Sequence, residues 1–223
     1  MITPELEAVI ARVRSEVSEL HQELIRWNLV VWTAGNVSAR VPGADLFVIK
    51  PSGVRYHELS PDKMVVCDLE GNLVDGGYTP SSDAISHAFV YRHMPTVGGI
   101  VHTHSSYATA WACRQEPIPP VISMVADEFG GEIPVGPLAR VGDDSIGRGI
   151  VETLTHSRSK AVLMANHGVF TIGKDALDAV KAAAMCEEVA KTVHLARVLG
   201  DPVPLPPDFI DYMNDRYQNV YGQ

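Results

Sequence analysis

The sequence predicts a mixed α/β fold, a single domain whose central, largely antiparallel β-sheet is flanked by helices. Its 223 residues suffice for one domain with a sizeable core. Two strand-like runs, 46–50 and 64–68, lie early in the chain, and Glu70-Gly71-Asn72 is typical of a hairpin tip. Because hairpins join antiparallel strands and amphipathic helices need a face to pack on, this order favours a sheet covered by helices.

Helices are expected where apolar residues recur at three- and four-residue spacing. The first should run over 4–27, with Thr3 as its cap and Pro4 in its first turn. The other predicted helices are 81–93, 105–113, 145–156 and 175–199. Buried strands are expected at 97–101 and 161–165, and the Pro- and Gly-rich segment 116–144 should be a loop with short strands.

The proline-rich run 201–207 follows the last predicted helix and should form a rigid, extended spacer. It would direct the tail, residues 208–223, away from that helix. We therefore expect one domain over 1–223 whose tail docks on a neighbouring subunit.

Composition and charge argue against several classes of function. The formal net charge is −9 and no Lys/Arg cluster interrupts it, so nucleic acid and anionic membranes are not expected partners. The sequence shows no signal peptide and no apolar stretch of about 18 residues, the length that spans a bilayer. Cys67, Cys113 and Cys186 are far apart, which favours reduced thiols. A soluble cytoplasmic protein is expected.

Three histidines follow two apolar, strand-like runs. His102 and His104 end the first run, and His167 comes just after the second. Side chains at i and i+2 of a strand point to the same face, so His102 and His104 can reach one ion. Three neutral imidazoles that leave coordination positions open describe a catalytic zinc site; the alternative is ordinary polar residues at strand ends. The remaining histidines, expected at the surface or the edge of the core, are His21, His57, His87, His93, His156 and His194.

Three polar turns could bind a phosphate group: 33–38, 50–53 and 80–83. Serine hydroxyls and free amides at a helix start bind phosphate, and a lysine adds positive charge. Each turn alone is explained as a turn or a helix cap, but together they predict a small phosphate pocket. Asp83 would stand beside it as a metal ligand or a base. No P-loop or dinucleotide fingerprint is present.

Two further residues are conspicuous. Asp127 interrupts an otherwise apolar segment, 125–129, predicted as loop, and Tyr221 is the third residue from the C-terminus. The alternatives are a solvated carboxylate and a frayed terminal side chain.

The ordered motifs resemble those of class II aldolase/adducin-type proteins over nearly the whole chain. They are Gly35-Asn36-Val37-Ser38, Ile49-Lys50-Pro51-Ser52-Gly53, Pro80-Ser81-Ser82-Asp83, Val101-His102-Thr103-His104 and Asn166-His167-Gly168. Within the family the chain is most similar to the epimerase branch. Asp83 stands where the aldolases carry a glutamate base, Ala126-Asp127 aligns with the epimerase aspartate, and Tyr221-Gly222-Gln223 resembles an ending that supplies a catalytic tyrosine.

The resemblance implies zinc-dependent epimerisation of L-ribulose 5-phosphate to D-xylulose 5-phosphate by C3–C4 cleavage and rejoining, with manganese or cobalt as alternative metals. It implies that His102, His104 and His167 bind the metal, with Asp83 as a fourth ligand or a base, and that Asp127 and Tyr221 transfer protons. The residues expected to hold the phosphate are Asn36, Lys50, Ser52, Gly53, Ser81 and Ser82. A cyclic homotetramer with active sites at its interfaces is also implied.

Three other functions stay open at this point. A class II sugar-phosphate aldolase of the fuculose-1-phosphate type would release the fragments, an adducin-like interaction module would need no metal, and a zinc hydrolase would need a base near the metal. Ala34, Val125 and the lack of a histidine after His194 depart from the epimerase pattern and leave the sugar open.

Overall fold

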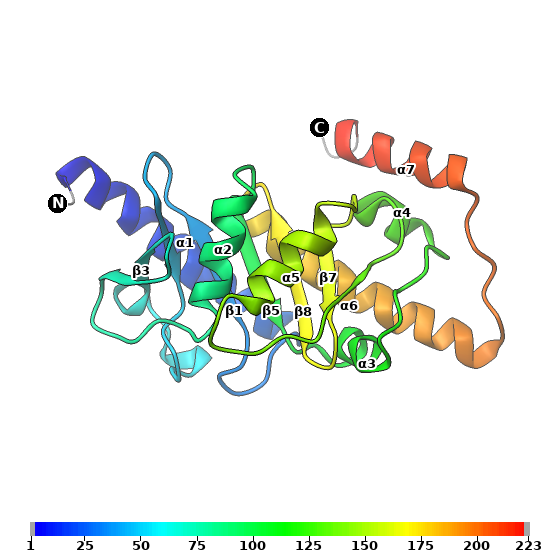
Figure 1. Ribbon diagram of the computed structural model, residues 1–223, viewed down its shortest axis with the longest axis horizontal. Helices are drawn as coiled ribbons and strands as arrows, with labels where there is room; N and C mark the ends of the chain where they lie inside the picture. The colour runs from blue at the N-terminus through cyan, green and yellow to red at the C-terminus, as the bar shows by residue number, and fades with distance from the viewer. Residues whose placement is uncertain (1–2, 221–223) are drawn as a thin grey trace.

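One eight-stranded sheet forms the centre of the computed structural model, which describes residues 3–220 (Figure 1). Its strand order is β4-β3-β2-β1-β5-β8-β7-β6, and every adjacent pair is antiparallel except β6 and β7. The strands are β1 (Asn36–Arg40), β2 (Leu46–Ile49), β3 (Val65–Asp68), β4 (Leu73–Asp75), β5 (Gly99–Thr103), β6 (Val135–Gly136), β7 (Ala161–Met164) and β8 (Gly168–Gly173). The predicted fold class is confirmed.

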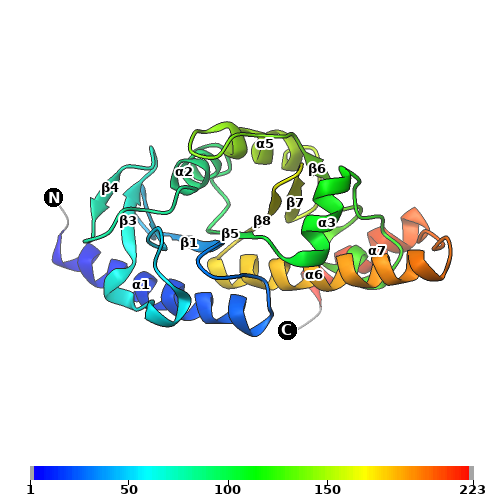
Figure 2. The ribbon, with the colours of Figure 1, turned by 90° about the horizontal axis from the view of Figure 1, so that it is seen from below.

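Helices cover both faces of this sheet: Figure 2 shows α2 and α5 on one side and α1 and α6 on the other. The helices are α1 (Pro4–Arg26), α2 (Ala84–His93), α3 (Ser106–Arg114), α4 (Ser123–Phe129), α5 (Ser145–Leu154), α6 (Ala176–Leu199) and α7 (Pro207–Asn219), with short 3-10 turns η1 (Tyr56–Glu58) and η2 (Pro61–Lys63). None of these described helices is both long and apolar enough to cross a membrane.

Strand alternation divides the core between the two faces. Along β5, Ile100 packs with residues of α2 and α5, whereas Val101 packs with residues of α1 and α6. Helix α6 approaches the sheet closely because glycines lie beneath it. A Cβ atom on Gly99 would lie 2.3 Å from the Cα atom of Ala176, so a larger residue there would push the helix away.

The segment 123–129 forms helix α4, so the prediction that 116–144 is loop with short strands is wrong at this point. Val125, Ala126 and Phe129 are fully buried, and Gly130 ends the helix with φ 63°. Burial of this apolar face stabilises the helix. The sequence did not predict it because prolines and glycines on both sides are typical of a loop.

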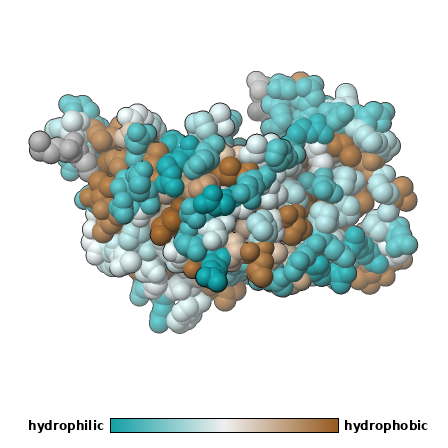
Figure 3. All heavy atoms as spheres, viewed as in Figure 1, coloured by the Kyte–Doolittle hydropathy of each residue, from teal (hydrophilic) through white to brown (hydrophobic). Residues whose placement is uncertain are grey.

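The tail folds back onto its own chain. Residues 201–206 contain no helix or strand and run as an extended connection, as predicted for 201–207, except that Pro207 already begins α7. Helix α7 lies beside α4 (Figure 1). Asn214 Nδ2 donates to the carbonyl oxygens of Ala126 and Asp127, at 3.2 and 3.0 Å. The viewer-facing surface of α7 is mostly hydrophilic (Figure 3). Docking of this tail on a neighbouring subunit stays a prediction.

Candidate active site

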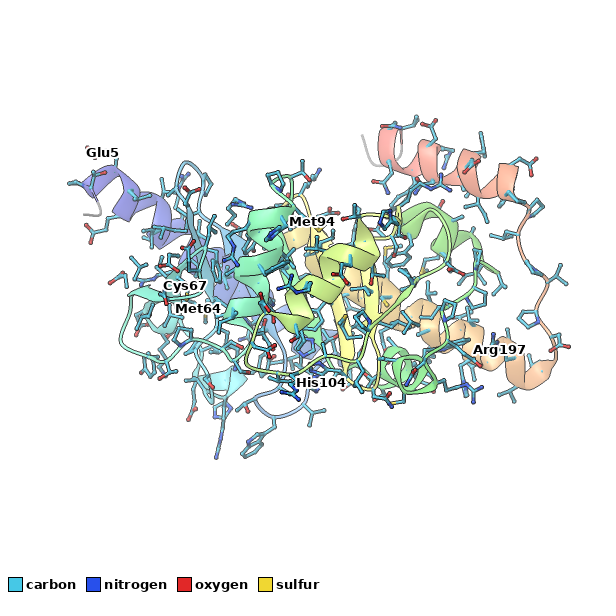
Figure 4. All side chains as sticks on the ribbon, in the orientation of Figure 1. Glu5, Met64, Cys67, Met94, His104 and Arg197 are labelled. Carbon is cyan, nitrogen blue, oxygen red and sulfur yellow. The ribbon has the colours of Figure 1, made fainter. Side chains whose placement is uncertain are left out.

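The three histidines that follow the strand-like runs meet where β5 and β7 end. Figure 4 labels His104, which lies at the bottom of the molecule in that view. Because Ile100 faces α2, His102 faces the same side two residues later, and His104 follows the strand end. His167 lies in the turn between β7 and β8, after Asn166, which has φ 56°. One ligand nitrogen from each histidine lies within 4.8 Å of the others.

The ring of His102 is held in one orientation. Its Nδ1 lies 2.9 Å from the carbonyl oxygen of Val169, so Nδ1 carries the proton and Nε2 is left as a ligand atom. The ring of Phe170 stacks on the imidazole of His102, with 4.1 Å between the two ring centres. Gly168 lies close to the same strand end, because a Cβ atom there would lie 2.5 Å from the carbonyl oxygen of Thr103 and 2.7 Å from Cδ2 of His104.

The electrostatics of the cluster suit a cation. Burial lowers the pKa of His102 to about 3, although the nearby charge of Asp83 opposes this. Burial also lowers the pKa values of His104 and His167, so all three rings are neutral at pH 7. Three neutral imidazoles, one of them oriented by a backbone carbonyl, are a donor set that divalent zinc, manganese or cobalt accepts. The residues therefore fit a metal.

Asp83 lies beside the histidines at the start of α2, as its N-cap. Its Oδ2 accepts a 2.7 Å hydrogen bond from Asn36 Nδ2, and Asn36 Nδ2 also lies 3.2 Å from Ser81 Oγ. Burial raises the pKa of Asp83, but His102, His87 and the Asn36 amide together hold it below the ordinary value. Asp83 is therefore an ionised, buried carboxylate that faces the cluster.

The structure also joins the serine-bearing loops. Ser52 N donates to the Thr79 carbonyl at 2.9 Å, and Ser81 N donates to the Lys50 carbonyl at 3.1 Å. Ser52 and Ser82 are exposed, so their hydroxyls are accessible. Gly53 is also exposed, and its φ of 69° suits a residue without a side chain.

Lys50 is buried beneath these loops. Its Nζ donates to the carbonyl oxygens of Thr33 and Pro51, at 3.1 and 3.3 Å. Burial lowers its pKa to about 8, and the charge of Asp83 opposes that shift. Lys50 therefore holds the neighbouring turn in place as well as contributing charge.

Asp127 is not brought to the histidines within one chain. The next residue, Glu128, pairs at 3.1 Å with Lys160, which precedes β7, whereas His167 follows the other end of that strand. Four residues of β7 alone span roughly 13 Å. Figure 1 shows α4 and α7 at the upper edge, opposite the edge at which His104 lies in Figure 4. Burial raises the pKa of Asp127, and Arg216 opposes this. Tyr221 lies outside the described residues.

Two histidines expected at the surface or at the edge of the core are fully buried, so those predictions are wrong. His21 Nδ1 lies 2.6 Å from the Val17 carbonyl, and its Nε2 accepts from Val37 N at 3.0 Å. His87 Nδ1 lies 2.7 Å from Ser38 Oγ. His21 falls within the apolar stripe of the first predicted helix, a signal that could have revealed its burial.

Comparisons with known proteins identify the family of this chain. A family model described as Class II Aldolase and Adducin N-terminal domain matches residues 15–194. Proteins named L-ribulose-5-phosphate 4-epimerase UlaF, from Salmonella paratyphi C (strain RKS4594) and Salmonella choleraesuis (strain SC-B67), are 38% identical over 95% of this chain and 96% of theirs. The chain belongs to the class II aldolase and adducin family.

Solved structures of L-fuculose-1-phosphate aldolases share the fold of this chain. An L-fuculose 1-phosphate aldolase superposes with a TM-score of 0.87 at 30% identity, covering 93% of this chain and 96% of that one. The L-fuculose-1-phosphate aldolase of Thermus thermophilus gives 0.71 at 26% identity, covering 84% of this chain and 96% of that one. By sequence the protein is an enzyme similar to the L-ribulose-5-phosphate 4-epimerases.

Proposed function

We propose that this protein is a zinc-dependent epimerase that converts L-ribulose 5-phosphate to D-xylulose 5-phosphate. The observation that carries the proposal is the convergence of three neutral imidazoles, His102, His104 and His167, beside the ionised Asp83 and two joined serine loops. The relatives named L-ribulose-5-phosphate 4-epimerase favour this substrate over other phosphorylated sugars.

The three histidines would hold the metal, with Asp83 as a fourth ligand or as a base. Zinc is favoured because three imidazoles leave open positions, and manganese or cobalt is an alternative. When bound, the metal supplies Lewis-acid stabilisation of the negative charge that develops on the ketose oxygens as the C3–C4 bond breaks.

Cleavage and rejoining of that bond avoids direct deprotonation of an unactivated carbinol carbon. The aldehyde fragment turns between the two steps, so that either face of its carbonyl can be attacked. Asp127 and Tyr221 take up and return the proton of the C4 hydroxyl, one for each epimer. The carboxyl of Asp127 is partly buried and its pKa is raised by that burial, which suits a group that must both accept and donate a proton.

The phosphate group would be held by the joined loops. The hydroxyls of Ser52, Ser81 and Ser82 and the open backbone of Gly53 provide donors, and Lys50 and Asn36 lie behind them. These contacts keep the glycolaldehyde phosphate fragment bound while its aldehyde group rotates. Retention of this fragment distinguishes an epimerase from an aldolase.

We further propose that the active site forms between subunits of a cyclic homotetramer, in the cytoplasm. The position of Asp127, at the opposite end of β7 from His167, supports a shared site, because one chain cannot bring both to the same sugar. The free Cys67, Cys113 and Cys186 are consistent with a reducing compartment.

The test incubates the zinc-loaded protein with L-ribulose 5-phosphate and follows two products. An epimerase forms D-xylulose 5-phosphate at a rate far above that of trapped glycolaldehyde phosphate. Trapped aldehyde that matches the loss of ketose would instead establish the aldolase. Failure of the purified protein to take up zinc and to form either product would contradict the proposal and favour an interaction module that needs no metal.

A further inference from the structure

We propose that Arg55 binds the substrate phosphate and that stacking on Trp32 holds its guanidinium in place. The proposal rests on the proposed function, because it assumes that a phosphorylated sugar occupies the pocket formed by the joined loops. It adds to that pocket a residue from outside the motifs that predicted it.

The charge balance of the pocket calls for a second cation. Segments 33–38, 50–55 and 79–83 contain two cations, Lys50 and Arg55, and one anion, Asp83. The negative charge of Asp83 offsets the positive charge of Lys50, and two carbonyl oxygens already accept hydrogen bonds from Lys50 Nζ. A phosphate group carries about −1.5 to −2 charges at pH 7. Lys50 alone therefore leaves most of the phosphate charge uncompensated.

Arg55 is placed to supply the missing charge. It is exposed, lies two residues after Gly53, and makes no ion pair with any residue in the described range 3–220. The nearby carboxylate of Glu58 accepts from the backbone amide of Arg55, at 3.3 Å. The planar guanidinium can give two parallel hydrogen bonds to a phosphate, which a lysine cannot do.

Trp32 provides the platform for this arginine. The Arg55 Cζ atom lies 4.5 Å from the centre of the indole ring. Trp32 is 69% exposed, and its φ of 60° is a left-handed conformation that is unfavourable for a large side chain. An exposed tryptophan in a strained backbone is poorly explained by packing, and strain of this kind clusters at ligand sites.

The loop that carries Trp32 is fastened to the loop that carries Arg55. The Thr33 carbonyl accepts from Lys50 Nζ, and the Ala34 carbonyl accepts from Tyr56 OH at 2.8 Å. Both loops lie at the lower edge of the molecule in Figure 1, the edge at which His104 lies in Figure 4. The stacked pair is thus fixed on the side of the sheet where the substrate would bind.

The experiment compares kcat/KM for L-ribulose 5-phosphate and for unphosphorylated L-ribulose, and the Kd of inorganic phosphate by calorimetry. The variants are Arg55→Gln, Arg55→Lys and Trp32→Leu. Arg12→Gln is the matched control, because Arg12 is also exposed and its loss changes the net charge equally. Ser82→Ala reports on the pocket itself, and circular dichroism checks that each variant is folded.

Arg55→Gln should lower kcat/KM for the phosphorylated sugar by about 10- to 150-fold, the value of one charge-assisted contact, and weaken phosphate binding alike. L-Ribulose should be turned over as by the wild type. Arg55→Lys should recover part of the loss, Trp32→Leu should cost about two- to fivefold, and Arg12→Gln nothing. Two results would refute the role of Arg55 without contradicting the phosphate pocket. One is an equal decrease of kcat/KM on both sugars in Arg55→Gln. The other is unchanged phosphate binding in Arg55→Gln while Ser82→Ala loses phosphate binding. No loss in either variant would refute the pocket and this proposal with it.

Discussion

Asn36 Nδ2 donates a 2.7 Å hydrogen bond to Oδ2 of Asp83, and Asn36 is also the cross-strand partner of His102 in the β1–β5 pair. A single buried amide therefore ties the carboxylate at the start of α2 to the strand that carries the first histidine. Because groups that orient metal ligands matter nearly as much as the ligands, this contact should be measurable in metal affinity.

Replacing Asn36 by Ala should weaken zinc binding by about 10- to 100-fold, because the buried Asp83 would lose its orienting donor. Competition with a chelator measures the affinity. Asn219→Ala is the control, since the amide of Asn219 bonds an exposed carboxylate, that of Asp215, at 2.8 Å. An Asn36→Ala protein with the zinc affinity of the wild type would show that the contact is only structural.

His104→Ala should lose most of the metal and the activity, because two imidazoles hold zinc far more weakly than three. Elemental analysis should find about one metal ion per wild-type chain and much less in the variant. His57→Ala, which removes an exposed histidine outside the cluster, should bind as the wild type does. Full metal content and activity in His104→Ala would contradict the site.

Ser82→Ala should weaken the phosphorylated substrate by about 10- to 150-fold, the loss expected for one hydrogen bond to a charged group. The unphosphorylated sugar should be little affected. Steady-state kinetics on both sugars measures the difference. Ser15→Ala is the control, because the hydroxyl of Ser15 bonds the Glu19 carboxylate on α1, outside the serine-bearing loops. Equal losses on the two sugars would mean that Ser82 serves only the helix start.

Two inactive variants, His104→Ala and Asp127→Asn, should restore activity when they are unfolded and refolded together. If a site takes its metal from one chain and its carboxylate from the next, about one quarter of sites in a random 1:1 mixture have both intact groups. Tyr221→Phe should behave as Asp127→Asn does. Native mass spectrometry must show mixed tetramers. Mixed tetramers without activity would mean that each site is built within one chain.

The buried His21 should make the fold less stable in mild acid. Burial lowers its pKa to about 3, whereas in the unfolded chain it is about 6.5. Below pH 6.5 the unfolded state therefore binds a proton that the folded state refuses, and stability falls until about pH 3. At pH 5 the loss is about 2 kcal/mol.

Urea unfolding at pH 7.5 and pH 5 measures this loss. His21→Gln can keep the contacts with Val17 and Val37 but cannot be protonated. The variant should therefore show a smaller decrease between the two pH values. Equal decreases in the two proteins would assign the acid sensitivity to other groups.

Local pattern was sufficient where one face of an element decides its structure. The apolar stripe of α1 and the spacing of His102 and His104 at the end of β5 both predicted what the structure shows, because side-chain direction repeats regularly along a helix or a strand. The turns 50–53 and 80–83 were likewise recognised from their serines and glycine. These patterns could not predict the two hydrogen bonds that join the turns 50–53 and 80–83, because the bonds link residues that are distant in the sequence.

Residue types at short spacing were enough to predict the sheet with its flanking helices, the cluster of three histidines and the serine-bearing turns. The packed molecule was needed to show that α4 is a helix, that His21 is buried, and that Trp32 supports Arg55. It also placed Asp127 at the opposite end of β7 from His167. These features escaped prediction because burial and long-range contact depend on how whole elements pack, and a short stretch of sequence does not contain its packing partners.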